Sequence, residues 1–218
     1  MTLPWKWDFA LSIVPALLGG LGYTVVASLL GSMIAIAVGL FWAILRMSRI
    51  PVISPVAVLI INFLRGTPTL IQLYFVFYVL PHYGLTLSIM MTGVLTLGIS
   101  FSGYTAEVFR TSIEAIRPGQ WEACLAMGLP IPHVWGRIVL PQAMRTATPM
   151  LGNYVILMFK ETAILSTIGL SELLGRGMEI GFLNFRFTEP LTIAAGLYFI
   201  VSYASARAIR RLEHALHA

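Results

Sequence analysis

The stretch Glu114–Pro141 reads EAIRPGQWEACLAMGLPIPHVWGRIVLP, and it is too polar for lipid although nearly everything around it is lipid-compatible. Its pattern predicts a short helix over residues 120–127. The pair Pro118–Gly119 interrupts the chain before this helix, and Gly128 stands where a glycine commonly ends one. These proline and glycine residues therefore predict a compact helical unit between two apolar regions.

A second short helix is predicted directly after Gly128. Pro130 and Pro132 suit its first turn, and we expect Pro141 to end it. On the first helix, residues at helical spacing form one face, namely Trp121, Cys124, Leu125 and Gly128. Glu122 points elsewhere. The alternative is an ordinary solvated loop, although a connection of about this length rarely contains so many helix-starting and helix-ending residues without a function.

The composition indicates an integral membrane protein. Of the 218 residues, 58% are hydrophobic and 11% are charged, and the mean hydropathy is +0.86. Soluble domains carry about 25% charged residues. We therefore expect an all-α protein with a single transmembrane domain over residues 1–218. The net charge of +5 indicates arginines that orient the chain in the membrane, rather than nucleic-acid binding.

The apolar runs predict five membrane-spanning helices, because one span needs roughly 20 apolar residues. The expected spans cover residues 21–45, 55–80, 87–109, 146–165 and 190–206. The first run carries no charge from residue 9 to residue 45. We expect Gly19, Gly20 and Gly22 to split it, so that residues 9–18 lie separately at the outer interface.

Three further features interrupt or extend the spans. The sequence Arg65–Pro68 lies within the second span and predicts a kink or an unwound turn. Residues 166–189 are polar and glycine-rich, and a short helix is expected near residues 171–174. The third span continues into charged residues at helical spacings of three and four, namely Glu107, Arg110, Glu114 and Arg117. This spacing favours a structural ladder of ion pairs along one helix face.

The basic residues predict the orientation of the chain. One side of the five-span arrangement receives nine arginines: Arg46, Arg49, Arg110, Arg117, Arg137, Arg145, Arg207, Arg210 and Arg211. The other side receives three basic residues: Lys6, Arg176 and Arg186. Because basic loops stay on the cytoplasmic side, we expect the N-terminus outside, and the C-terminus and the loop at residues 114–141 in the cytoplasm.

Six polar side chains within the predicted spans are candidates for a translocation path. They are Arg65, Gln72, Tyr104, Asn153, Lys160 and Glu161. A charge at the bilayer centre costs about 2.5–3.5 kcal/mol on insertion scales, so the three charged members carry a functional hypothesis. The alternatives are mutual pairing, snorkelling of Lys160 to the surface, and a fixed bend at Arg65. Each uncharged member is more often a helix–helix contact.

The sequence contains none of the common enzyme motifs. It has no GxxxxGK[ST] phosphate loop, no HExxH and no GxSxG, and its single cysteine leaves no cysteine–histidine metal spacing. We therefore expect no ATP hydrolysis by this chain, no cofactor and no metal. Two alternatives remain: an ion-coupled secondary carrier, for which no internal repeat is visible, and an intramembrane enzyme, for which no catalytic motif is visible.

The loop at residues 114–141 resembles the EAA loop of ABC importer permeases. The matching residues are Glu122, Ala123, Gly128, Ile138, Leu140 and Pro141, with Cys124 in place of the usual third alanine. Other stretches resemble the polar-amino-acid branch, which includes histidine, glutamine and ectoine permeases. They are residues 65–81, 103–110, 151–162 and 185–190. The N-terminal WKWDFALSIVP and the FKET motif are most similar to ectoine and hydroxyectoine permeases.

This resemblance implies a type I importer permease fold in the bacterial inner membrane. It implies that the loop is a coupling helix that docks in a groove of a cytoplasmic ATPase. The implied contact residues are Trp121, Glu122, Ala123, Cys124, Gly128, Ile138, Leu140 and Pro141. The implied partners are two ATPases, a second permease subunit that is a copy or a paralogue, an external solute-binding protein and membrane lipid, with no nucleic acid.

The resemblance also implies a substrate, which is a polar amino acid or an ectoine-type compatible solute. Both kinds of solute carry a cationic nitrogen centre and a carboxylate. Glu161 and Arg65 lie at adjacent depths of the predicted spans, by the helical rise per residue. We therefore expect Glu161 to take the cationic group and Arg65 or Lys160 to take the carboxylate.

Overall fold

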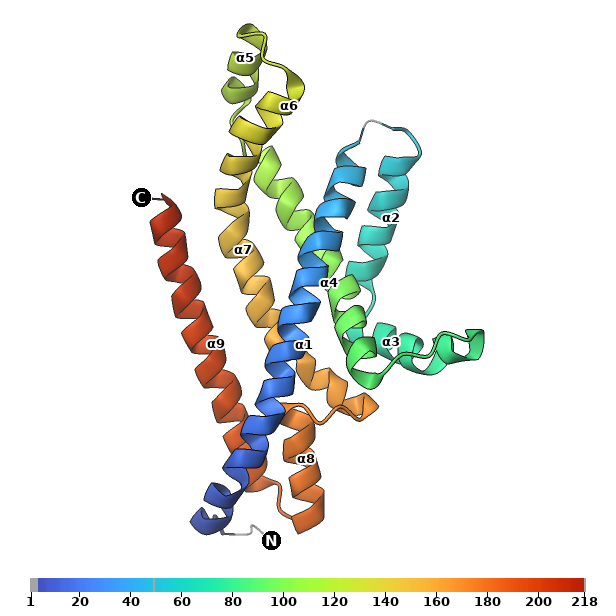
Figure 1. Cartoon of the computed structure of the whole chain (residues 1–218), viewed down its shortest axis with the longest axis vertical. Coiled ribbons are helices and arrows are strands. Elements are labelled where there is room, and N and C mark those ends of the chain that lie inside the picture. Colours follow the sequence, from blue (N-terminus) through green and yellow to red (C-terminus); the bar gives the residue numbers. More distant parts are fainter. Residues whose placement is uncertain (1–3, 49, 218) are drawn as a thin grey trace.

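The computed structural model describes residues 4–48 and 50–217, and every regular element in this part of the chain is helical (Figure 1). The α-helices are α1 (Trp7–Met47), α2 (Ile53–Gly66), α3 (Thr69–Tyr74), α4 (Ile89–Glu114), α5 (Pro118–Ala126), α6 (Ile131–His133), α7 (Leu140–Glu161), α8 (Leu173–Asn184) and α9 (Thr188–His217). Shorter π- and 3₁₀-helical turns are η1 (Phe75–Val79), η2 (Leu80–Tyr83), η3 (Val134–Val139) and η4 (Thr162–Ile168). The predicted all-α class is confirmed. Arg49, which the charge count uses, lies outside the described residues.

α1 is one continuous helix of 41 residues, so the prediction that its glycines split the first apolar run is wrong. An α-helix satisfies its backbone hydrogen bonds internally, which makes a break costly in lipid. Gly20 serves close packing instead, because a Cβ at this residue would lie 3.0 Å from the carbonyl oxygen of Glu172. Residues 9–18 therefore belong to the same helix as residues 21–45.

α1 packs most extensively against α4 along a stripe of small residues. The stripe consists of Ala27, Gly31, Ala35, Gly39 and Ala43. Small side chains let two helices approach closely in a medium where the hydrophobic effect drives little association. The hydroxyl of Thr105 on α4 donates a hydrogen bond of 2.6 Å to the carbonyl oxygen of Ala35. This helix pair forms the centre of the bundle.

The second apolar run bends by 100° between α2 and α3, which confirms the interruption predicted at Arg65–Pro68. Pro68 has no N–H, so the carbonyl oxygen of Leu64 lacks its usual helical donor. The side-chain amide of Gln72 replaces that donor at 3.0 Å and also donates to the hydroxyl of Thr67 at 2.7 Å. Gln72 thus stabilises the bend.

The prediction that Pro141 ends the second short helix is wrong. α6 passes through the π-helical turn η3 into α7, and Pro141 lies in the first turn of α7. A π-helical turn shifts the backbone hydrogen bonds by one residue, which accommodates a residue without an N–H. The helical unit that begins at Ile131 is therefore continuous with α7.

Three helices of the described chain are long and apolar enough to cross a membrane, namely α1, α4 and α9. Two bent pairs reach the required length together: Ile53–Gly66 with Thr69–Tyr83, and Ile131–Ile168 with Leu173–Asn184, which bends by 43°. α8 is longer than the short helix predicted at residues 171–174. The two termini lie at opposite ends of the bundle, and α5 and α6 project at the end opposite the N-terminus (Figure 1).

Candidate functional site

The projecting unit of α5, α6 and η3 is held to the bundle by its own small core. Its buried members are Ile113, Ile116, Cys124, Val134, Val139 and Ala143. The ring of Trp121 on α5 meets the ring of Trp135 edge to face, with centroids 5.6 Å apart. These contacts join α5 to the end of α4 and the start of α7. Trp121 and Cys124, two of the four residues predicted to share one face of this helix, both pack into this core.

The other two members of that predicted face point outward. Leu125 is 81% exposed, and Gly128 is also exposed. Each residue of a helix turns by about 100°, so Leu125 cannot follow Cys124 into the core. Glu122, Met127 and Ile131 of the same unit are exposed as well. Several large apolar side chains exposed on one projecting unit are typical of a protein interface.

Gly128 ends α5 with a left-handed backbone, at a φ of 62°. The N–H of Leu129 donates to the carbonyl oxygen of Cys124 at 3.2 Å, and the N–H of Gly128 donates to that of Leu125 at 3.0 Å. Glycine favours this conformation because it has no Cβ. The predicted helix end at Gly128 is confirmed.

A hollow of about 390 Å³ lies between α5 and the junction of η3 with α7. Its lining residues are Gln120, Ala123, Cys124, Met127, Arg137, Ile138, Pro141, Gln142 and Arg145. Four of the predicted contact residues are in this lining, namely Ala123, Cys124, Ile138 and Pro141. A fifth, Leu140, precedes Pro141 in the sequence and is 40% exposed. Sequence reasoning had used Arg137 and Arg145 only for orientation. Their presence makes the hollow suitable for an acidic side chain of a partner.

A second concave site lies between α2, α4, α7 and α9 and has a volume of about 660 Å³. We call it the membrane cavity. Its lining residues are Arg65, Tyr104, Glu107, Val108, Thr111, Met150, Asn153, Tyr154, Ile156, Leu157, Lys160 and Ala206. It brings together four of the six candidates for a translocation path. It does not include Gln72, which stabilises the α2–α3 bend, or Glu161, which is half-buried outside this lining.

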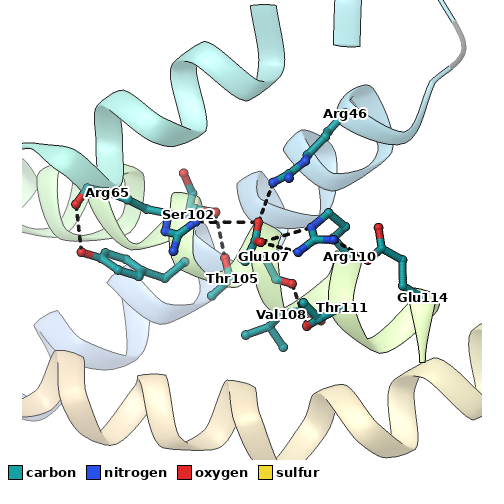
Figure 2. A network of polar contacts seen from close by, with 10 residues as sticks. Arg46, Arg65, Ser102, Thr105, Glu107, Val108, Arg110, Thr111 and Glu114 are labelled. Atoms are coloured by element: carbon teal, nitrogen blue, oxygen red, sulfur yellow. Dashed lines mark hydrogen bonds and ion pairs between the residues drawn. The ribbon is translucent and has the colours of Figure 1, made fainter. Parts of the chain in front are cut away.

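Arg65 is positioned by Tyr104. The Tyr104 hydroxyl donates a hydrogen bond of 3.3 Å to the backbone carbonyl of Arg65 (Figure 2). The Arg65 guanidinium lies over the Tyr104 ring, 5.6 Å from its centroid, which is within cation–π range. α4 therefore fixes the end of α2 and directs its cationic group to the wall of the membrane cavity.

Glu107 lies among three arginines that come from three helices (Figure 2). Its carboxylate is 2.5 Å from Arg46 Nη1, 2.5 Å from Arg110 Nη2 and 3.8 Å from Arg65 Nη1. Arg110 also pairs with Glu114, so three of the four members of the predicted ladder interact. Arg117 forms no ion pair within the described residues. Sequence spacing could not reveal Arg46 and Arg65, because both reach Glu107 from other helices.

Lys160 and Asn153 complete the polar wall from α7. The Lys160 side chain is exposed, and it has no ion pair or hydrogen bond within the described part of the chain. Met150, Tyr154 and Leu157 cover the rest of this wall with largely apolar surface. The membrane cavity thus combines apolar walls with a few polar groups, as is usual for sites of small molecules.

Sequence reasoning missed Glu172, which is fully buried. It caps α8 by accepting hydrogen bonds from the N–H groups of Leu174 at 3.1 Å and Gly175 at 2.7 Å. It also accepts from the hydroxyls of Thr24 on α1 at 3.1 Å and Tyr198 on α9 at 2.7 Å. Glutamate is not one of the usual N-cap residues, so the sequence carried no clear signal for this role.

An all-helical bundle with membrane-length helices, a largely apolar cavity that holds a few polar groups and a helical unit projecting at one end is consistent with the membrane component of a transport system. A comparison of the sequence with known families supports this class over most of the chain. Residues 35–214 match the family of binding-protein-dependent transport system inner membrane components, and the chain belongs to this family.

Individual relatives are similar over nearly the whole chain. A probable amino-acid ABC transporter permease protein of Sinorhizobium fredii, y4tG, is 38% identical over 98% of this chain and 95% of that protein. The L-cystine transport system permease protein TcyB of Bacillus subtilis is 33% identical over 90% of this chain and 85% of that protein. The crystal structure of an amino acid ABC transporter with histidines contains a chain with a TM-score of 0.93 and 32% identity, over 97% of this chain and 99% of that one. The MetNI methionine ABC transporter, at 18% identity and a TM-score of 0.74, supports the fold alone.

Family membership places the chain in the inner membrane as a multi-pass permease subunit. The predicted type I permease fold is supported by these structural neighbours. Subunits of this kind do not hydrolyse ATP, because a separate subunit does so, and the expectation that this chain is not an ATPase is confirmed. The alternatives of a secondary carrier and an intramembrane enzyme are not favoured.

Proposed function

We propose that this chain is the permease subunit of an ABC importer that moves a polar amino acid, or an ectoine-type compatible solute, across the inner membrane. The observation that carries the proposal is the helical unit that projects from one end of a membrane-length bundle (Figure 1). This unit exposes apolar side chains and the acidic Glu122. The relatives named above include amino-acid and cystine permeases, which supports the amino-acid class. Residues 1–218 then act as a single permease domain.

The projecting unit is proposed to be the coupling helix that docks on the partner ATPase. Glu122 and Leu125 are exposed and contact the ATPase directly, whereas Trp121 and Cys124 hold α5 against the bundle. The other proposed contact residues border the hollow or the end of α5: Ala123, Gly128, Ile138, Leu140 and Pro141. Because α6 and η3 continue into α7, a displacement of the unit is transmitted to the helix that carries Lys160.

The proposed topology has five spans, with each bent pair counted as one. The N-terminus is outside and the C-terminus is cytoplasmic. The separation of basic residues along the bundle supports this orientation: Arg137 and Arg145 lie at the hollow beside α5, whereas Arg186 pairs with Glu189, which also accepts a hydrogen bond from the N–H of Lys6. The location of the termini at opposite ends agrees with an odd number of spans (Figure 1).

The membrane cavity is proposed to be part of the translocation path. Arg65, Tyr104, Asn153 and Lys160 contact the solute there. Glu161 remains a candidate for a contact outside this cavity, and Gln72 contributes by stabilising the α2–α3 bend. A solute that moves between α2 and α7 would leave contacts on one helix for contacts on the other.

The proposed partners are two ATPases, a second permease subunit and an external solute-binding protein. Membrane lipid covers the exposed apolar faces of the outer helices, and no nucleic acid takes part. The resemblance of the N-terminal sequence to ectoine permeases favours a paralogue over a second copy as the partner permease.

ATP-dependent uptake by the complete transporter in proteoliposomes tests the proposal, with the solute chosen by a ligand screen of the binding protein. Glu122→Lys and Gly128→Arg should leave the permease in the membrane but abolish transport-linked ATP hydrolysis. Arg210→Gln, at an exposed site on α9, is the control and should transport normally. If uptake survives both coupling changes at normal expression, the unit is a plain connector and its docking role is wrong.

A further inference from the structure

The charged groups at the membrane cavity differ in how many partners of opposite charge they have. Glu107 is the one carboxylate in the lining among the described residues, and three arginines surround it. The two cationic side chains of the lining, Arg65 and Lys160, have no carboxylate at close range in the part of the chain that the structure describes. Arg65 reaches a carboxylate only at 3.8 Å, and Lys160 reaches none within 4.0 Å in the described chain.

The charge balance around the cavity is therefore positive. Arg46, Arg65 and Arg110 contribute three positive charges, and Glu107 and Glu114 contribute two negative charges, which leaves one positive charge in this cluster. Lys160 adds a second positive charge from the opposite wall. Arg65 and Lys160 are both exposed at the cavity, so a bound solute can meet their charges directly.

We infer that the membrane cavity selects by charge, taking solutes with a free carboxylate and a net charge of zero or below and disfavouring cationic amino acids. The inference rests on the proposed function and specifies its substrate class. It differs from the expectation that Glu161 supplies a negative partner for the solute, because Glu161 is not in the cavity lining. A neutral or acidic amino acid presents its α-carboxylate to the cations, whereas an arginine side chain adds a repelled charge.

The geometry suits recognition of a carboxylate. The Arg65 guanidinium is planar and lies over the Tyr104 ring, so its N–H groups form a fork for two carboxylate oxygens. Lys160 approaches from α7 as a more mobile point charge. The amide of Asn153, on the same wall, can accept a hydrogen bond from the solute's amino group or donate one to its carboxylate.

A direct test uses the complex of both permease subunits with the ATPases in lipid nanodiscs, without the binding protein. Equilibrium binding is measured with radiolabelled L-glutamate, L-glutamine and L-arginine. We expect glutamate and glutamine to bind at least about ten-fold more tightly than arginine. Lys160→Gln should weaken glutamate binding by about ten-fold and narrow the difference from arginine, whereas Lys160→Arg should retain the preference.

Arg210→Gln is the matched control, because it removes a positive charge from an exposed site that does not line the cavity, and it should leave all three affinities unchanged. Tighter binding of arginine than of the other two probes, or a preference unaffected by Lys160→Gln, would overturn the inference. Binding of none of the three probes would overturn it as well. ATP-driven uptake by the complete transporter would still support the proposed function in each of these cases.

Discussion

The hydroxyl of Tyr198 on α9 donates a hydrogen bond of 2.7 Å to the carboxylate of Glu172, the residue that caps α8. The same carboxylate oxygen accepts from Thr24 on α1. One buried side chain thus links three helices at the end of the bundle opposite the projecting unit (Figure 1). Buried polar groups of this kind are costly when a partner is removed, which makes the link testable.

Removal of the Glu172 carboxylate is expected to destabilise the protein strongly. Glu172→Ala leaves the N–H groups of Leu174 and Gly175 and the hydroxyls of Thr24 and Tyr198 without their acceptor, so we expect a loss of roughly 3–5 kcal/mol. Tyr198→Phe removes one donor and should cost about 1.5 kcal/mol. Thermal unfolding of the purified permease in detergent measures both.

Tyr203→Phe is the matched control for this series, because Tyr203 is on the same helix but is 48% exposed. Loss of the Tyr203 hydroxyl should change the melting temperature little. Equal effects of Tyr198→Phe and Tyr203→Phe would show that the link to Glu172 does not contribute to stability.

A second prediction concerns the three arginines around Glu107. Glu107→Gln removes the carboxylate that Arg46, Arg65 and Arg110 share, so we expect a loss of about 2–3 kcal/mol and a lower yield in the membrane. Glu114→Gln is the comparison. Its side chain is 55% exposed and, among the described residues, pairs with Arg110 alone, so the expected loss is below about 1 kcal/mol. Similar losses for both variants would contradict a central role of Glu107.

Much of the fold was predictable where local chemistry decides it. Gly128 ends α5 because the chain needs a left-handed residue there, and Pro68 bends the second apolar run because it removes a backbone donor. Both effects act within a few residues. The continuation of the helix through Pro141 was not predictable, since it depends on a π-helical turn that has no clear sequence signature.

The candidate site was predictable only in part. The cost of charge in lipid drew attention to Arg65 and Lys160, and both line the membrane cavity. Glu107 was assigned only to a local ladder, because sequence spacing shows neighbours on one helix but not Arg46, which is 61 residues away. The buried position of Glu172 likewise depends on α1 and α9, which come to it from distant parts of the chain.

The orientation of the chain can be tested by cysteine labelling. Cys124 itself is only 3% exposed, so a maleimide should react slowly with it in the folded protein. In a Cys124→Ala permease expressed without the ATPase, which would cover α5, Glu122→Cys should be labelled by a membrane-impermeant maleimide in inside-out vesicles and not in intact spheroplasts. Tyr83→Cys, at a site that is 77% exposed, should show the reverse pattern. Labelling of Glu122→Cys from the outside would exclude the proposed topology.

The last prediction separates the backbone role of Gly128 from a role in partner contact. A Cβ at this residue would meet no atom within 4 Å, so steric conflict within the chain is not the reason for glycine. The left-handed φ of 62° is the reason, and alanine there should cost about 1–2 kcal/mol. Asparagine tolerates this conformation better. We therefore expect Gly128→Ala to speed amide hydrogen exchange across α5 and to reduce transport-linked ATP hydrolysis, and Gly128→Asn to change both less. Loss of ATP hydrolysis in both variants with unchanged exchange would show that the partner ATPase needs an open surface at Gly128, rather than a particular backbone conformation.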